Sequence, residues 1–161
     1  MINRTENLRA LSIRQPYADE ICDGYKLEEF RSWESSWAGL TLIHASSQAT
    51  PAIIGFAFKE ATCNQYGPKS YGHVMTAPAR LLRPVHTPGA LYYWRPQRNR
   101  PRQAIAFQEA YQAILAGDWT APEPEWSGLL LIQHGHVPEL PEPEPRIFIA
   151  GPAGLQEHRL G

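Results

Sequence analysis

Cysteine and long apolar runs are both scarce in this chain of 161 residues. Its two cysteines, Cys22 and Cys63, stand in apolar surroundings and lack the spacing of metal ligands, which argues against a disulfide scaffold and favours a reduced intracellular protein. No apolar run approaches membrane-spanning length, and residues 1–12 lack the apolar core of a signal peptide. We therefore expect a cytoplasmic protein that does not bind membranes.

Charge of one sign is missing from two segments, although the formal net charge of the whole chain is only −1. Residues 80–102 contain six arginines and no acidic residue, whereas residues 118–144 contain six acidic residues and no lysine or arginine. This distribution bears on binding partners more directly than the net charge does. The histidines also lack the supporting cysteines or carboxylates of a metal site, so we expect no metal ion and no cofactor.

The stretch from Leu11 to Ser46 carries the most information about fold and chemistry. Its apolar alternation predicts a strand, which must end before Pro16 because proline has no N–H to donate to a ladder. Pro16 also suits the first turn of a short helix over residues 17–23, and Gly24 suits its end. A single-domain chain of this length can bury a proper core behind such elements.

A second strand follows, in which Glu29 and Arg31 share parity and are expected on one face. Lys26 has the opposite parity and is expected to reach in from the mouth of that strand. Residues 40–46 predict a third strand. The ends of these strands could gather several polar side chains into one pocket: Arg14, Lys26, Glu29, Arg31, His44 and Ser46.

Residues 24–31, GYKLEEFR, fit the G-x-K-x-x-E-x-R signature of the activating signal cointegrator homology (ASCH) domain. Residues 11–17, LSIRQPY, and residues 43–46, IHAS, resemble the usual neighbours of that signature. The resemblance implies an α+β fold built on a mixed β-barrel like that of the pseudouridine synthase and archaeosine transglycosylase (PUA) domain, with short helices. It also implies a function related to RNA.

In the family the signature positions line a cleft, which implies a ligand site here; without the resemblance, an exposed charged strand face would be the simpler interpretation. Lys26 and Arg31 would then bind a phosphate or carbonyl oxygen, and Glu29 would hold Arg31 or accept hydrogen bonds from a base edge. We expect the cleft to recognise an RNA nucleotide or a modified nucleobase through the following residues: Arg14, Gln15, Tyr17, Lys26, Arg31, Trp33, His44 and Ser46.

A catalytic alternative stays open, because the family includes an amidohydrolase of N4-acetylcytidine and ribonucleases. Lys26 and Glu29 would be the reacting pair of such a metal-independent hydrolase. In the amidohydrolase branch a threonine stands where this chain has Glu29, so the hydroxyl that works beside the lysine is missing here. A carboxylate beside Lys26 also favours the charged ammonium, which opposes its use as a general base.

The basic segment is the second candidate site. Its arginines alternate with Tyr92, Tyr93 and Trp94, and together they offer phosphate neutralisation and base stacking for single-stranded nucleic acid. A solvated rim with core aromatics is the alternative interpretation. We expect these arginines to contact the nucleic-acid backbone: Arg80, Arg83, Arg95, Arg98, Arg100 and Arg102.

The family resemblance weakens after residue 46 and ends near residue 96, so we expect a barrel over 1–96 and an extension over 97–161 packed on it. Four further strands are expected, at residues 52–63 with Gly55 as a bulge, at 73–85 broken by Pro78, at 89–96 and at 146–151. A buried strand is expected at 128–134, and a helix at 101–116. The apolar face of this helix is expected to hold Ala104, Phe107, Tyr111, Ile114 and Leu115, with Gln103, Gln108, Glu109 and Gln112 largely outside it.

The acidic proline-rich residues 138–145 are either a solvated connection or a cover that competes with nucleic acid for the arginines. A protein-interaction module that uses this tract and the helix at 101–116 is a third possible function. The sequence leaves the oligomeric state open.

Overall fold

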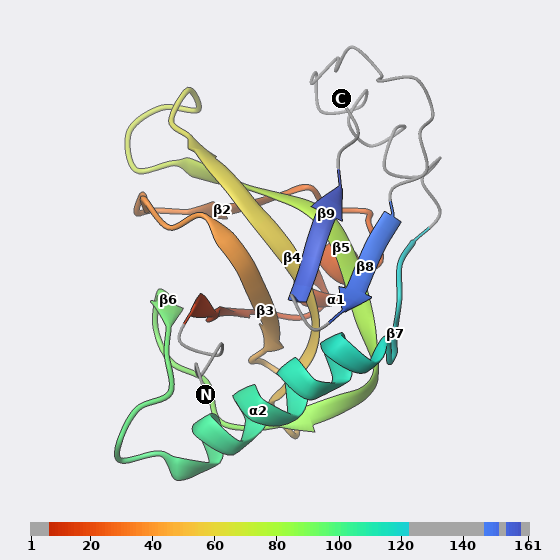
Figure 1. Ribbon diagram of the computed structural model, residues 1–161. Coiled ribbons are helices and arrows are strands. Elements are labelled where there is room, and N and C mark those ends of the chain that lie inside the picture. The colour runs from red at the N-terminus through yellow and green to blue at the C-terminus, as the bar shows by residue number, and fades with distance from the viewer. Residues whose placement is uncertain (1–6, 123–146, 152–153, 159–161) are drawn as a thin grey trace.

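The computed structural model describes residues 7–122, 147–151 and 154–158, and a curled mixed sheet forms its body (Figure 1). The strands run in the order β2-β5-β4-β3-β1-β6, and β7 pairs with β5 off this path. Strands β1 and β3 are parallel, and the other pairs in this sheet are antiparallel. The strands are β1 (Arg9–Ile13), β2 (Glu28–Arg31), β3 (Gly39–Ala45), β4 (Ala52–Cys63), β5 (Tyr71–His86), β6 (Tyr93–Trp94) and β7 (Trp119–Thr120).

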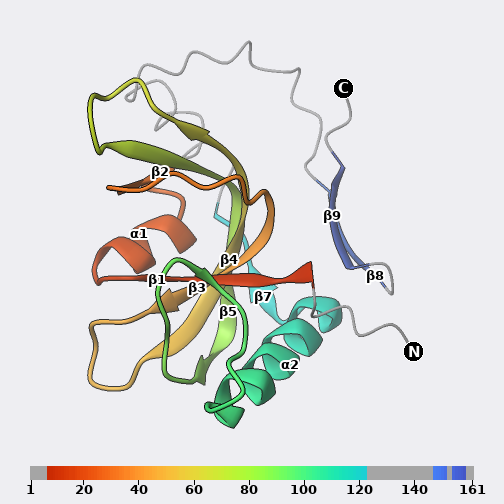
Figure 2. The same cartoon turned by 90° about the vertical axis from the view of Figure 1, so that its left-hand side faces the viewer.

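Two helices cover the sheet, α1 (Tyr17–Cys22) on one face and α2 (Pro101–Ala116) on the other (Figure 2). Because side chains alternate between faces along a strand, the sheet builds a separate core with each helix. Leu11 and Ile43 pack with α1, whereas their neighbours Ala10 and Leu42 pack with α2. This α+β arrangement agrees with the fold class expected from the sequence.

A two-stranded hairpin, β8 (Ile147–Gly151) and β9 (Gly154–His158), forms a second sheet beside α2. Strand β8 confirms the expected strand at 146–151. Strand β9 was not among the strands expected from the sequence. The expected strand at 128–134 and the acidic tract at 138–145 lie outside the described residues.

The two ends of the curled sheet are joined by side-chain hydrogen bonds, because within the described residues no backbone hydrogen bonds pair the strands there. Strand β2 lies at one end of the strand order and β1 and β6 lie at the other. Arg31 of β2 nevertheless donates a hydrogen bond from Nη2 to the backbone oxygen of Ser12 in β1, at 2.8 Å. His73 of β5 bonds the Tyr93 hydroxyl of β6 at 2.7 Å. We call this closure, made by Arg31, Ser12, His73 and Tyr93, the seam.

The first half of the chain confirms most of the expected elements. Strand β1 ends at Ile13, before Pro16, and α1 is followed by Asp23 and by Gly24, whose φ of 82° suits glycine. Strand β4 has the predicted bounds, and the ladder shifts register next to Gly55 as expected of a bulge. Only a short loop joins β3 to β4.

Two expectations for the later strands are wrong. Strand β5 runs unbroken through Pro78, because its pairing with β4 shifts register around Ala77, which has a φ of 50°, and the missing N–H falls within that irregularity. The strand expected at 89–96 is only Tyr93–Trp94, because Tyr92 adopts a φ of 60°, which is incompatible with an extended strand.

Helix α2 has the predicted bounds, and Phe107, Tyr111 and Ile114 of its predicted apolar face are buried. Two positions near its start differ from the prediction. Gln103, expected to face solvent, is fully buried, and Ala104, expected in the core, is exposed. The side chain of Gln103 is buried because it forms hydrogen bonds with the chain on both sides of β6: Nε2 donates to the Pro88 and Gly89 oxygens, and Oε1 accepts from Gln97 N–H. The spacing of apolar residues along the helix cannot by itself predict this role of a polar side chain.

Two histidines and a lysine are buried with polar partners. His44 is 1 % exposed, His73 is 0 % exposed and Lys59 is 2 % exposed. Burial lowers the pKa of each of them because the charged forms lose hydration. Both imidazoles are therefore held neutral, with one ring nitrogen donating and the other accepting.

Replacing Gly55 by alanine is expected to destabilise the fold. An added Cβ would collide with the Ala79 backbone oxygen and with Sγ of buried Cys22. Since a backbone oxygen in a paired strand cannot move away, we expect the free energy of unfolding to fall by about 1–3 kcal/mol, measured by chemical denaturation. Ala61→Ser, at the exposed end of β4, is the control and should change the free energy of unfolding by less than about 0.5 kcal/mol.

Acidification is also expected to destabilise the fold, through His44 and His73. The pKa of each is lower in the folded chain than the usual 6.5, so the unfolded chain binds more protons once the pH falls below about 6.5. The thermal midpoint should therefore fall between about pH 7.5 and about pH 5.5. His73→Gln keeps a donor and an acceptor, and its thermal midpoint should fall less than that of the parent. An equal fall in both proteins would contradict the assignment of the acid effect to His73.

Candidate functional site

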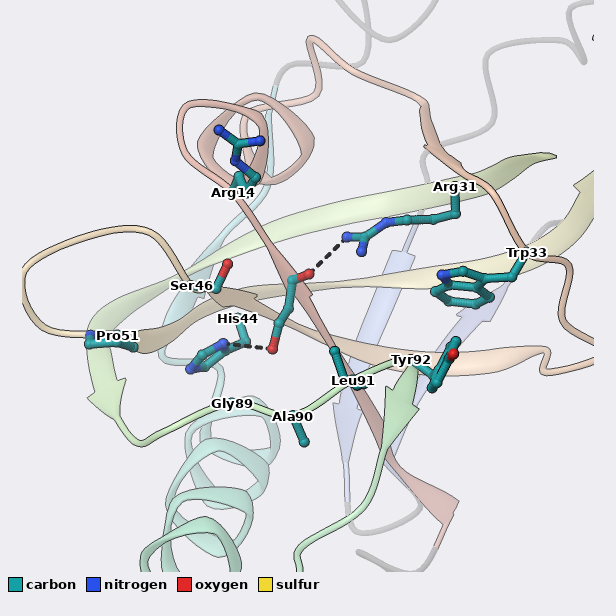
Figure 3. A pocket seen from close by; sticks show the side chains of 11 residues that line it. Arg14, Arg31, Trp33, His44, Ser46, Pro51, Gly89, Ala90, Leu91 and Tyr92 are labelled. Atoms are coloured by element: carbon teal, nitrogen blue, oxygen red, sulfur yellow. Dashed lines mark hydrogen bonds between the residues drawn. The ribbon is translucent and has the colours of Figure 1, made fainter. Parts of the chain in front are cut away.

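A pocket of about 470 Å³ opens at the seam, between β1, β3, the segment after β2 and the loop that precedes β6 (Figure 3). Hollows of this size suit a small ligand or a single residue of a polymer. Its walls come from five separate segments of the chain. The lining residues are Ser12, Arg14, Arg31, Trp33, His44, Ser46, Pro51, Gly89, Ala90, Leu91 and Tyr92.

Two arginines supply the charge of the pocket. Arg31 is held at one edge, where Nη2 donates to the Ser12 oxygen and lies 3.5 Å from Oε2 of Glu29. Arg14 follows the end of β1 and is exposed. Among the described residues neither Nε nor Nη1 of Arg31 has a hydrogen-bond acceptor, so Arg31 can still bind an anion or a carbonyl oxygen.

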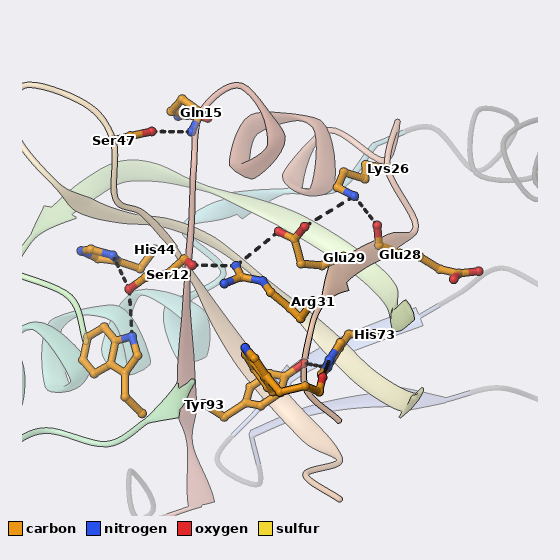
Figure 4. A network of polar contacts seen from close by, with 12 residues as sticks. Ser12, Gln15, Lys26, Glu28, Glu29, Arg31, His44, Ser47, His73 and Tyr93 are labelled. Atoms are coloured by element: carbon orange, nitrogen blue, oxygen red, sulfur yellow. Dashed lines mark hydrogen bonds and ion pairs between the residues drawn. The ribbon is translucent and has the colours of Figure 1, made fainter. Parts of the chain in front are cut away.

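Glu29 links Arg31 to Lys26 (Figure 4). The Glu29 side chain is only 9 % exposed, and its Oε1 lies 3.6 Å from Nζ of Lys26. Lys26 also donates a hydrogen bond to the backbone oxygen of Glu28. The three charged residues of the signature therefore form a row, in which Arg31 lines the pocket while Glu29 and Lys26 stand behind it.

Trp33 and Tyr92 form the aromatic wall. Their ring centroids are 5.0 Å apart and their planes meet at 74°. Tyr92 is 59 % exposed. Trp33 also makes edge contacts with His73 and Tyr93, and its backbone oxygen accepts a hydrogen bond from Nε2 of His73 at 3.0 Å. The ring of Trp33 is thus fixed from behind by the seam.

The back wall is a closed hydrogen-bond chain around His44. Its Nε2 lies 2.8 Å from the Thr87 oxygen, which can only accept, so Nε2 carries the proton and Nδ1 accepts from the Ser12 hydroxyl at 3.0 Å. Trp94 Nε1 donates to the same Ser12 Oγ at 3.1 Å. Because Ser12 both donates and accepts here, this Ser–His contact is a structural link.

The loop of residues 87–92 is held over this wall from outside the sheet. Arg100 Nη1 donates to the Gly89 oxygen at 2.8 Å, and Gln103 donates to the same oxygen. Gly89 approaches Ser12 and His44 so closely that a Cβ would lie 2.6 Å from Cε1 of His44. Only glycine therefore fits at the base of the loop.

The segment that carries Trp33 is held from β4. Buried Lys59 donates from Nζ to the Ser35 oxygen at 3.0 Å and to Oγ1 of Thr62 at 2.6 Å. The Thr62 hydroxyl donates to the Ser35 oxygen as well. The aromatic wall is therefore positioned by polar contacts from β4 and from His73 of β5.

The pocket gathers some of the residues that the sequence nominated and leaves others outside. Arg14, Arg31, Trp33, His44 and Ser46 line it, whereas Lys26, Glu29, Gln15 and Tyr17 do not. The Gln15 side chain accepts from Asp19 N–H and donates to Gln48 Oε1. Half-exposed Tyr17 lies beside Lys26, whose Nζ is 5.6 Å from the ring centroid.

The six arginines of residues 80–102 have different surroundings. Arg80 forms ion pairs with Asp19 and Asp23 at 2.9 Å each, and so ties β5 to α1. Arg102 donates to the His86 oxygen and pairs with Glu109 at 3.3 Å. The others include Arg100, which holds the loop of residues 87–92, and the exposed Arg83, Arg95 and Arg98.

Sequence reasoning missed Ser12, Pro51 and residues 89–91 as lining residues. The segment TPGAL at 87–91 has the composition of a turn, but its last three residues fall within the strand expected at 89–96. Its contact with β1 is made by residues far apart in the chain, so no local pattern reveals it. No metal-binding group of three or more histidine, cysteine or acidic side chains occurs within the described ranges, and no helix there is long and apolar enough to cross a membrane.

Comparison with known proteins gives one family and similar solved structures. A family model described as the ASCH domain matches residues 11–118. ASCH from Zymomonas mobilis is 17 % identical, with a TM-score of 0.47 over 73 % of this chain and 99 % of that chain. A tyrosine-to-phenylalanine mutant of that protein is also 17 % identical, with a TM-score of 0.45 over 62 % of this chain and 96 % of that chain. No curated protein matches.

The match extends past the expected boundary at residue 96 and includes α2, whose Phe107 and Ile114 pack into the core of the sheet. The division at residue 96 stays a prediction. The ASCH domain has a PUA-like fold, and the curled mixed sheet with its two helices agrees with that fold. Membership of this family suggests RNA binding in general. Since the matched residues are more than half of the sequence, the chain belongs to the ASCH domain family.

Proposed function

We propose that the pocket at the seam binds one unpaired nucleotide of an RNA strand or the corresponding free nucleotide. The observation that carries this proposal is the meeting of two guanidinium groups and two aromatic rings in one hollow of about 470 Å³. Sequence-specific recognition of RNA uses unpaired bases that stack on aromatic side chains, with arginine on the phosphates. The pocket offers both partners to the same nucleotide.

Arg31 is the fixed cation of the proposed site, and Arg14 is the exposed cation at its rim. Arg31 is held on one side by Ser12 and Glu29, so little conformational entropy is lost when its other nitrogens bind a phosphate. Glu29 and Lys26 act through Arg31 in this proposal. They keep its guanidinium oriented toward the pocket without contacting the nucleotide held there.

The base would lie against Trp33 and Tyr92 and be read by nearby polar groups. The Ser46 hydroxyl lines the opposite side. The backbone N–H groups of Gly89, Ala90 and Leu91 have no acceptor within the described part of the chain. Such donors suit the carbonyl oxygens and ring nitrogens of a base edge.

Exposed arginines outside the pocket would extend the contact along the RNA backbone. Arg83, Arg95 and Arg98 are exposed, and we assign them this role. Arg80, Arg100 and Arg102 already bond acidic side chains or backbone oxygens, so their contribution to phosphate binding should be smaller.

The hydrolase hypothesis receives less support than binding does. Its reacting pair, Lys26 and Glu29, does not line the pocket. Lys26 Nζ is instead engaged by the Glu29 carboxylate at 3.6 Å and by the backbone oxygen of Glu28. Binding without turnover is therefore the function that we propose.

Arg14→Gln is expected to weaken nucleotide binding without affecting folding, because the side chain is exposed at the pocket rim. We expect about a tenfold rise in Kd for the tightest-binding homotetraribonucleotide, and a salt slope shallower by about 0.7 for the lost phosphate contact. Titration calorimetry at several salt concentrations measures both.

Lys69→Gln removes an equal charge from an exposed loop and is the matched control. The RNA recovered after each titration should be intact by mass spectrometry, because the proposed function is binding without turnover. Equal Kd values for Arg14→Gln, Lys69→Gln and the parent would refute the role of Arg14, and RNA products that require the protein would favour the hydrolase.

Tyr92→Asn is expected to remove base stacking while preserving the backbone, because asparagine tolerates the φ of 60° at this position. The loss of one stacking contact should weaken binding by about 1–3 kcal/mol for every homotetraribonucleotide that binds. Tyr92→Phe retains the ring and should bind as the parent does. If asparagine and phenylalanine have equal effects, the ring does not stack on the ligand.

A further inference from the structure

A cluster of exposed aromatic rings surrounds Lys26 outside the pocket. Tyr17 is 50 % exposed, Phe30 is 47 % exposed and Tyr66 is 41 % exposed. The Lys26 Nζ lies 5.6 Å from the ring centroid of Tyr17 and 5.1 Å from that of Phe30, and Phe30 meets Tyr66 edge to face at 5.2 Å. We call Tyr17, Lys26, Phe30 and Tyr66 the aromatic platform.

The platform is assembled from three distant segments. Tyr17 begins α1, Phe30 stands in β2, and Tyr66 lies in the loop between β4 and β5. Rings of this size are normally buried, and a group of them at the surface marks a binding site more often than a solvated face. The function proposed for the pocket does not use these rings.

Four acidic side chains beside the platform have partners. The Glu28 carboxylate accepts from the Tyr66 hydroxyl at 2.8 Å, and Glu29 pairs with Lys26. Asp19 and Asp23 on α1 pair with Arg80. A surface with aromatic faces and a single, already paired ammonium suits a base better than it suits a row of phosphates.

One carboxylate separates the platform from the pocket. Oε1 of Glu29 lies 3.6 Å from Lys26 Nζ, and Oε2 of the same group lies 3.5 Å from Nη2 of Arg31 (Figure 4). The cation of the platform and the fixed cation of the pocket are therefore neighbours.

We propose that the aromatic platform is a second stacking site, which takes the base adjacent to the nucleotide held in the pocket. This inference rests on the proposed function of the pocket and specifies its ligand as a strand of at least two unpaired ribonucleotides. Phe30 and Tyr17 provide the ring faces. Lys26 contacts the carbonyl edge of the base between them while it stays paired with Glu29.

Comparison of mononucleotides with short strands tests this inference. Calorimetry with the four ribonucleoside 5′-monophosphates and the four homotetraribonucleotides, on the whole chain, measures the pocket alone and the pocket with the platform. We expect Phe30→Ala to raise the Kd of the tightest-binding tetranucleotide about tenfold and to leave that of its mononucleotide unchanged. Tyr17→Ala should act in the same direction. Ile105→Ala, an equally exposed apolar position on α2, is the matched control.

Each outcome decides the inference separately from the proposed function. A tetranucleotide affinity unchanged in Phe30→Ala and Tyr17→Ala would overturn the platform and leave the pocket standing. An equal loss for both ligand types would show that Phe30 acts on the pocket, and would also overturn it. A parent protein that binds neither ligand would refute both proposals. A parent that self-associates in sedimentation, with Phe30→Ala monomeric and binding RNA normally, would assign the platform to a second copy of the chain.

Discussion

The hydrogen bond from Arg31 to the backbone oxygen of Ser12 is the interaction on which the described site depends. It joins β2 to β1, which stand toward opposite ends of the strand order, and so closes a sheet whose backbone ladder stays open there. A closure made by side chains leaves space between strands that a continuous ladder would fill. The pocket occupies this space, and the guanidinium that closes the seam also lines the pocket.

Two walls of the pocket are held by elements that do not line it. Gln103 of α2 fixes the loop that carries Gly89, and Lys59 of β4 fixes the segment that carries Trp33. These anchors are buried polar side chains with backbone partners, whose loss would leave unsatisfied groups in the core. The site is therefore preorganised by the whole sheet and by α2, and the helix is part of the functional unit.

The charged residues of the signature divide between two surfaces. Arg31 faces the pocket, Lys26 faces the exposed rings, and Glu29 neutralises part of the charge of both. Two cations close together would repel each other, and the shared carboxylate makes their proximity favourable at low exposure. In the two proposals, a single short motif therefore contacts two neighbouring bases of one strand, one in the pocket and one on the platform.

Local pattern determined much of this protein. Pro16 ended β1, Gly24 ended α1, parity placed Glu29 and Arg31 together, and the signature identified the family, because each of these effects acts over a few residues. Tertiary structure decided which side chains share a hollow. The inward turn of Gln103, the exclusion of Lys26 from the pocket and the inclusion of Gly89 depend on contacts between segments far apart in the chain. Those contacts are fixed by the curl of the sheet and by the packing of α2, which no spacing of residues along one strand encodes.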